Sequence, residues 1–155
     1  MEQFPHDEPV NWAWGLSLVA LTIAIHATGV VVLALVGLRI RVRIANRRPG
    51  LRYVIPIVIG LVAAAGLLVA VLHGIEAAIW ATAYVWLGAL DSPWDAILYS
   101  VGSMSTRGAS GLTLQEHWRM LGALEAVDGM LLFGISTAYI FALMQTYWPM
   151  LYRRH

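Results

Sequence analysis

The segment DSPWDAILYSVGSMSTRGASGLTLQEHW, residues 91–118, decides the fold, because a long apolar segment lies on each side of it. Its first residues, Asp91-Ser92-Pro93, are a typical helix start, with a capping side chain followed by a proline in the first turn. The pattern predicts a helix over 94–104, which is too short to cross a bilayer. Residues 105–111 are too rich in small residues to continue it. A short helix and an irregular strand between two spans predict a re-entrant loop, which lipid tolerates only against protein or a water-filled cavity.

The composition excludes an ordinary soluble protein. Of the 155 residues, 59% are hydrophobic and 12% are charged, whereas soluble domains carry about 25% charged residues. The formal net charge of +1 gives no general attraction to nucleic acid. The absence of cysteine excludes disulfides, thiolate metal sites and cysteine nucleophiles. The chain is therefore expected to be an integral, all-α membrane protein with the lipid bilayer as a partner and no nucleic-acid partner.

Three apolar segments, 12–38, 54–90 and 118–148, predict three transmembrane helices. At 1.5 Å per residue the second would be roughly 55 Å long, enough for two spans or for one long helix. The charges favour one helix, because it leaves Asp91, Asp95 and Glu116 on the same side as the acidic amino terminus.

The orientation follows from the arginines. Six of them lie between Arg39 and Arg52, in a segment expected to form a cytoplasmic loop. The amino terminus is then periplasmic and the carboxyl terminus cytoplasmic, in what we expect to be a bacterial inner (plasma) membrane. Residues 1–53 would hold the first helix and the arginine-rich loop, and residues 54–155 would form a pore module.

Two motifs carry a resemblance to a known family. AILYSVGSMSTRGASG (96–111) and GMLLFGISTA (129–138) resemble the pore loop and inner helix of small bacterial potassium-channel-like proteins, members of the tetrameric cation channel superfamily. The resemblance implies a homotetrameric pore with an outer helix over 54–90, a pore helix and filter over 92–111, and an inner helix over 118–148. It implies a hinge at Gly129, with Phe133 and Thr137 facing an inner cavity. The implied filter residues are Ser105, Thr106, Arg107, Gly108, Ala109, Ser110 and Gly111.

The filter departs from the family signature T-V/L-G-Y-G-D. Arg107 replaces the hydrophobic residue, Ala109 the tyrosine and Ser110 the second glycine. A carbonyl ladder of the potassium type needs those glycines and that rear packing, so we expect a filter of another type. Four copies of Arg107 around one axis would favour anions; alternatively each arginine pairs with Asp95, Glu116 or Glu125. The function expected is passive transport of an inorganic ion, and the alternative is a non-conducting structural or regulatory subunit.

Five ionisable residues fall within the apolar spans, where each should face protein or water. Glu125 lies three residues from Asp128, and His73 three residues from Glu76, so each pair shares a helical face. Interhelical hydrogen bonds, for example from His26 to Glu76, are the favoured explanation; a proton relay or gate and a metal site are the alternatives. No metal, no cofactor and no enzymatic activity are expected, and a membrane metalloprotein is the third hypothesis. The five residues are His26, His73, Glu76, Glu125 and Asp128.

Overall fold

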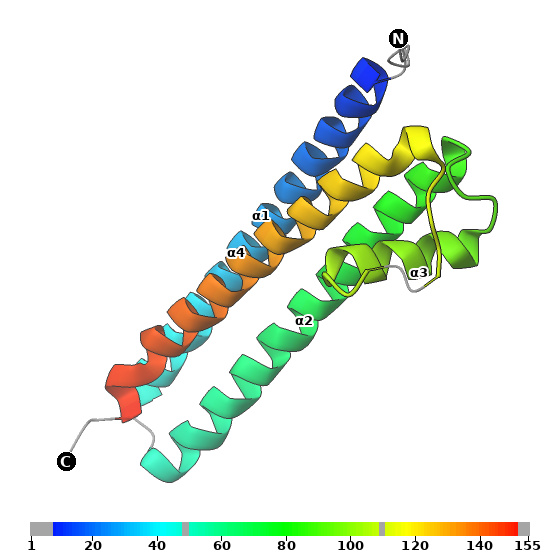
Figure 1. Ribbon diagram of the computed structural model, residues 1–155. Helices are drawn as coiled ribbons and strands as arrows, with labels where there is room; N and C mark the ends of the chain where they lie inside the picture. Colours follow the sequence, from blue (N-terminus) through cyan, green and yellow to red (C-terminus); the bar gives the residue numbers. More distant parts are fainter. Residues whose placement is uncertain (1–7, 48–49, 109–110, 152–155) are drawn as a thin grey trace. The chain divides into compact units, whose positions relative to one another are not determined.

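The computed structural model describes residues 8–47, 50–108 and 111–151, and its regular secondary structure is entirely helical, without a strand in those ranges. The helices are α1 (Glu8–Arg47), α2 (Leu51–Trp86), α3 (Pro93–Met104), the 3-10 helix η1 (Glu116–Trp118) and α4 (Arg119–Leu151) (Figure 1). Three of them, α1, α2 and α4, are long and apolar enough to cross a membrane. The all-α class is thereby confirmed, and three helices that could cross a membrane lie where the sequence predicted three spans.

The second predicted span is one continuous helix, as the charges indicated. It ends at Trp86, earlier than the predicted Leu90, because Gly88 adopts a left-handed conformation with φ of 70°. The Ala89 N–H then donates to the Tyr84 carbonyl at 2.8 Å, which closes the helix end. Glycine takes this conformation without the steric cost that a side chain would bring.

The arginine-rich segment is not the loop that the sequence predicted. Helix α1 continues through Arg39, Arg41 and Arg43 to Arg47. Arginine has a high helix propensity, and Pro49-Gly50 is the first helix-breaking pair after the apolar run. The first helix, with 40 residues, is therefore about half as long again as the apolar segment 12–38, and its last turns carry positive charge.

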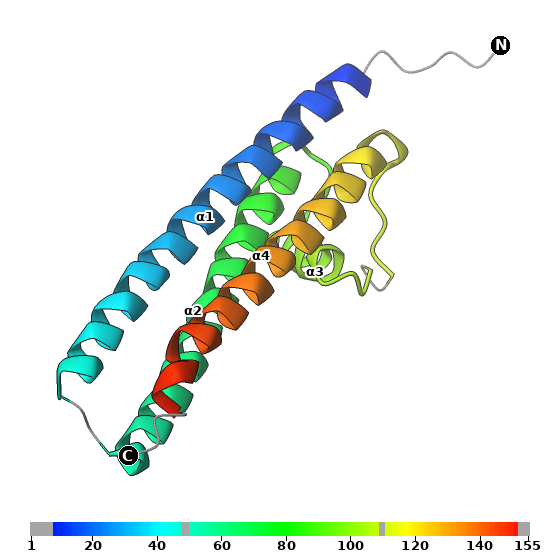
Figure 2. The same cartoon turned by 90° about the vertical axis from the view of Figure 1, so that its left-hand side faces the viewer.

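The short helix α3 confirms the predicted start and end. Ser92 caps it by accepting a hydrogen bond from the Asp95 N–H at 3.3 Å, and Pro93 occupies its first turn. It ends at Met104, where the small residues begin. Its 12 residues span roughly 18 Å, well below a hydrocarbon thickness of about 30 Å. Figures 1 and 2 show α3 lying obliquely beside α2 and α4.

The chain forms two compact units, and each long helix contributes to both. The first unit comprises Met1–Ile25 and His73–Phe133, and the second His26–Leu72 and Gly134–His155. The expected division at residue 53 followed chain order, whereas these units follow packing. The first core contains Ala77, Trp80, Ala81, Tyr84, Ala89, Ala96, Met104, Leu114, Leu121 and Leu132. The second contains Ile44, Ala65, Val69, Tyr139, Leu143 and Tyr147.

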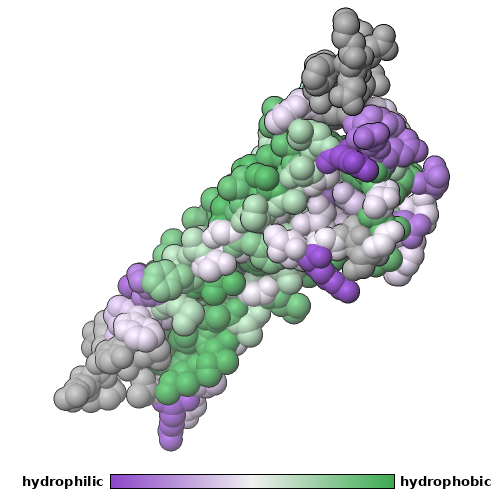
Figure 3. Space-filling view, in the orientation of Figure 1, coloured by the Kyte–Doolittle hydropathy of each residue, from purple (hydrophilic) through white to green (hydrophobic). Residues whose placement is uncertain are grey.

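The exposed faces of the helices are largely apolar, as expected for segments in contact with lipid or with another chain. In Figure 3 hydrophobic side chains cover most of the visible helical surface, and hydrophilic ones lie around the start of α4 and also where α2 begins. Trp94 and Val101 on α3 are 70% and 51% exposed. A short helix with one buried and one exposed apolar face has a second surface available for packing.

Candidate functional site

The first unit contains a buried carboxyl network, with Glu125 of α4 beside α3. The Tyr84 hydroxyl of α2 donates to Glu125 Oε2 at 2.7 Å. Ser100 Oγ of α3 makes a very close hydrogen bond with Glu125 Oε1. The same Ser100 Oγ lies 2.8 Å from the Ala77 carbonyl oxygen of α2. Tyr84, Ser100 and Glu125 are completely buried, so these contacts join three helices inside the apolar core.

Asp128, one turn further along α4, has its own partners. The Thr22 hydroxyl of α1 donates to Asp128 Oδ2 at 2.6 Å, and the Trp80 indole N–H of α2 donates to the same oxygen at 3.0 Å. Thr22, Trp80 and Asp128 are also completely buried. The two carboxyl groups together therefore connect α4 with every other α-helix of this unit.

The residues that pair with these carboxyl groups were missed by sequence reasoning. Thr22, Trp80, Tyr84 and Ser100 carried no signal of their own as partners of a carboxyl group. Helical spacing alone could have placed Ser100 on the α3 face shared with Ala96 and Ser103. These three residues are the buried stripe of a helix whose opposite face is apolar and exposed.

The other pair of ionisable residues, His73 and Glu76, also meets as its spacing predicted. His73 Nδ1 lies 3.2 Å from Glu76 Oε2, and Glu76 is completely buried. The His73 ring stacks on Phe133, with ring centroids 4.3 Å apart. In the second unit, His26 Nε2 lies 3.0 Å from Ser136 Oγ, and both side chains are buried.

The expected filter segment begins as a turn. The Gly108 N–H donates to the Gly102 carbonyl at 3.1 Å, so residues 105–108 fold back toward the end of α3. Thr106 and Gly108 have positive φ angles of 59° and 77°, and a β-branched residue rarely adopts such an angle. Arg107 is exposed. Ala109 and Ser110 lie outside the described residues, and Gly111 has φ of 80°.

The expected hinge and cavity residues lie on a continuous α4. A side chain at Gly129 would meet the Met104 backbone, with the carbonyl oxygen 2.5 Å from the position of a Cβ atom. Gly129 thus permits close approach of the end of α3 to α4. Phe133 is 45% exposed in the first unit, and Thr137 is exposed in the second.

Tyr99 of α3 packs beside the carboxyl network. Burial raises the pKa of the Tyr99 hydroxyl above its ordinary value. The Tyr99 ring packs edge-on against that of Tyr84, with centroids 5.3 Å apart. Tyr99 therefore stays a neutral hydroxyl at physiological pH.

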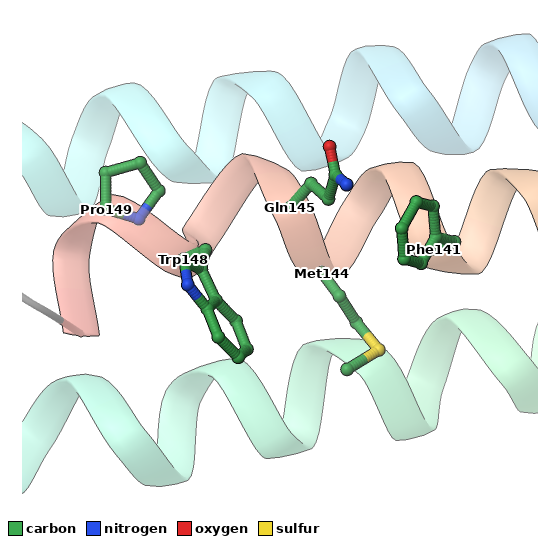
Figure 4. Close-up of a pocket in the computed structure, with 5 residues that line it drawn as sticks. All are labelled: Phe141, Met144, Gln145, Trp148 and Pro149. Carbon is green, nitrogen blue, oxygen red and sulfur yellow. The ribbon is translucent and has the colours of Figure 1, made fainter.

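The second unit carries a shallow pocket of about 300 Å³ on α4 (Figure 4). Figure 4 shows Met144 and Trp148 extending from the helix toward α2. None of the five lining side chains is ionisable, so the pocket offers apolar contact and one amide. They are Phe141, Met144, Gln145, Trp148 and Pro149.

Comparisons of the chain with protein-family models, with curated proteins and with solved structures gave no match.

Proposed function

We propose that this protein is the subunit of a homotetrameric membrane pore for passive ion transport, with a filter that is not of the potassium type. The observation that carries the proposal is α3. It is a capped helix too short to cross a membrane, it lies between two helices long enough to do so, and buried polar contacts hold it. Such a helix followed by irregular backbone is the arrangement that pore loops use.

The backbone after α3 supports a role for the segment 105–111. Thr106, Gly108 and Gly111 have positive φ angles, which regular helices and strands of L-residues do not contain. A strained angle at a residue such as Thr106 persists only where its surroundings enforce it, and functional sites are the usual place. Exposed carbonyl groups of such a segment can replace part of an ion's hydration shell.

One loop per chain cannot surround an axis, so the proposed pore requires several copies. The exposed apolar face of α3 suits packing against a neighbouring copy. Four copies would place four Arg107 side chains near the pore mouth, because Arg107 is exposed. In this arrangement the amino terminus is periplasmic, and the arginines that end α1 lie at the cytoplasmic face of a bacterial inner membrane.

The proposal is tested by ion flux into liposomes that contain the purified protein. Potassium, sodium and chloride gradients should each be tried, and flux should exceed that of empty liposomes. Arg107→Leu should raise the ratio of cation to anion flux, whereas Arg119→Leu, the same change at an exposed site on α4, should leave the ratio unchanged. Absence of flux in every gradient across a range of pH would overturn the proposal.

One observation favours a second candidate, a non-conducting subunit with a structural or regulatory role. The hydrogen bond from the Gly108 N–H to the Gly102 carbonyl folds the start of the filter segment back onto the end of α3, whereas a ladder of carbonyl groups around an ion needs a strand that runs along the pore. A four-fold symmetric particle without flux would support this candidate. A particle without four-fold symmetry would exclude the pore as proposed.

A further inference from the structure

The buried hydrogen bonds around Ser100 contain one more acceptor than the visible donors can serve. Ser100 Oγ lies 2.8 Å from the Ala77 carbonyl oxygen, which can only accept, and very close to Glu125 Oε1. A serine hydroxyl carries one proton. If the hydroxyl donates to Glu125, Ser100 Oγ and the Ala77 carbonyl oxygen face each other at 2.8 Å with no proton between them. Sharing that proton between the two acceptors would weaken both hydrogen bonds.

The number of donors equals the number of acceptors when Glu125 carries a proton. We propose that Glu125 is a neutral carboxylic acid that donates to Ser100 Oγ, and that this proton latches α3 to α2 and α4. The Ser100 hydroxyl then donates its own hydrogen bond to the Ala77 carbonyl, so the hydrogen bonds run from α4 through α3 to α2. The Tyr84 hydroxyl still donates to the other carboxyl oxygen. Each polar atom in the chain has one partner of the opposite kind.

The surroundings of Glu125 favour the neutral form. The titratable groups facing it are Tyr84 on α2, Tyr99 on α3 and Asp128 on α4, and none of them brings a positive charge. Described residues 12–25 of α1 contain no titratable side chain. Ser103, which makes a further contact with the carboxyl group, donates to the Gly122 carbonyl at 3.2 Å. A buried carboxylate without a cation is costly, whereas the acid is a donor that this site can use.

Loss of the proton would break the latch. An ionised Glu125 accepts the hydrogen bond of the Ser100 hydroxyl. That hydroxyl then no longer donates to the Ala77 carbonyl, and the hydrogen bond between α3 and α2 is lost. Raising the pH should therefore loosen α3 from α2, and lowering it should restore the contact. The inference concerns how α3 is held and does not depend on whether the protein conducts ions.

Infrared difference spectroscopy of the full chain in lipid nanodiscs tests the protonation state. The spectrum of the wild type minus that of Glu125→Gln should show the carbonyl stretch of a protonated carboxyl group. Ser100→Ala should shift that band, because the acid loses its acceptor, while Ser105→Ala should leave it in place. Glu116→Gln, at an exposed position, should remove only carboxylate bands. Carboxylate bands in the Glu125 difference spectrum would overturn the proposal.

Hydrogen exchange of α3 tests the latch itself. After correction for the intrinsic pH dependence, amide exchange over 93–104 should accelerate in the wild type at alkaline pH by about threefold to tenfold, the effect of losing one buried hydrogen bond. Glu125→Gln keeps a donor and an acceptor but cannot ionise, so its α3 exchange should not accelerate. Glu125→Asp, whose shorter side chain cannot reach Ser100 from the same backbone, should exchange rapidly at every pH. Equal acceleration in the wild type and in Glu125→Gln would refute the latch.

Discussion

The two compact units are built from the same three long helices but are held together differently. Within the part of the chain that the structure describes, the three buried acidic side chains, Glu76, Glu125 and Asp128, all lie in the first unit. The second unit has no buried acidic side chain among the described residues: Leu143 packs against Gly37, the Tyr147 hydroxyl donates to the Gly37 carbonyl at 2.7 Å, and His26 contacts Ser136 at 3.0 Å. Both arrangements suit lipid, where close packing and hydrogen bonds replace the hydrophobic effect as the force between helices.

The difference follows from what each unit must hold. The second unit aligns helical segments whose backbone groups are bonded internally. The first unit also contains α3 and the irregular backbone after it. Neither is part of a long helix, so contacts with other segments must fix their position. The hydrogen bonds of Ser100 with Glu125 and with the Ala77 carbonyl supply that position for α3, and Thr22 and Tyr84 join α1 and α2 to the α4 carboxyl groups. Polar contacts are thus concentrated where the chain departs from simple spans.

The largest effect is expected where α3 touches α4 most closely. Gly129→Ala places a Cβ atom 2.5 Å from the Met104 carbonyl oxygen, and only a backbone shift can relieve that contact. The free energy of unfolding should fall by about 1–3 kcal/mol. Gly134→Ala meets no atom within 4 Å on the same helix and should be neutral or stabilising by up to about 1 kcal/mol. Thermal unfolding in detergent compares the two, and equal effects would remove the close approach from the account.

The Asp128 contacts give the next largest effect. Asp128→Ala leaves the Trp80 indole N–H without this acceptor inside the apolar core. The Thr22 hydroxyl, in contrast, can still donate to the Leu18 carbonyl 2.9 Å away. Unfolding free energy should drop by about 1–3 kcal/mol. Tryptophan fluorescence follows both stability and the environment of the indole. The exposed control, Glu116→Ala, should change neither, and a silent Asp128→Ala would contradict the role of the polar network.

A single hydrogen bond in the second unit should matter less. Tyr147→Phe removes only the bond to the Gly37 carbonyl and should cost about 0.6 kcal/mol, the usual value for such a bond between membrane helices. Tyr53→Phe at an exposed position is the matched control. If Tyr147→Phe lowered the free energy of unfolding as much as Asp128→Ala does, the two units would not differ in the way proposed.

The smallest effect is expected at the exposed pair Glu116 and Arg119, whose charged atoms lie 4.0 Å apart. Solvent screens such a pair, and holding two long side chains offsets the attraction. Glu116→Gln should therefore leave the unfolding midpoint unchanged at low and at high salt. A salt-dependent loss of stability would show that surface charge holds the start of α4.

Much of the fold was predictable because it depends on local chemistry. The Ser92-Pro93 start of α3, its end at Met104 and the continuity of α2 follow from capping, small residues and the positions of charges. The arginines after Leu38 were assigned to a loop because their charge was used to set topology and their helix propensity was not. Charge determines which side of the membrane a segment occupies, not whether it is helical.

The site was predictable only in part. The spacing of Glu125 and Asp128 indicated a shared face, but their partners depend on how each helix is rotated about its axis, which a single sequence does not encode locally. Gly129 was expected to be a hinge from resemblance, while the structure gives it a packing contact that becomes visible only once α3 is in place. Long-range contacts of this kind are the part that sequence reasoning misses.

The central claim is that residues 91–118 enter the bilayer and return to the same face. Because the chain contains no cysteine, Asp91→Cys, Glu116→Cys and Arg47→Cys each introduce one labelling site. A membrane-impermeant maleimide added to oriented vesicles should label positions 91 and 116 from one face and position 47 only from the other. Labelling of 91 and 116 from opposite faces would contradict the claim.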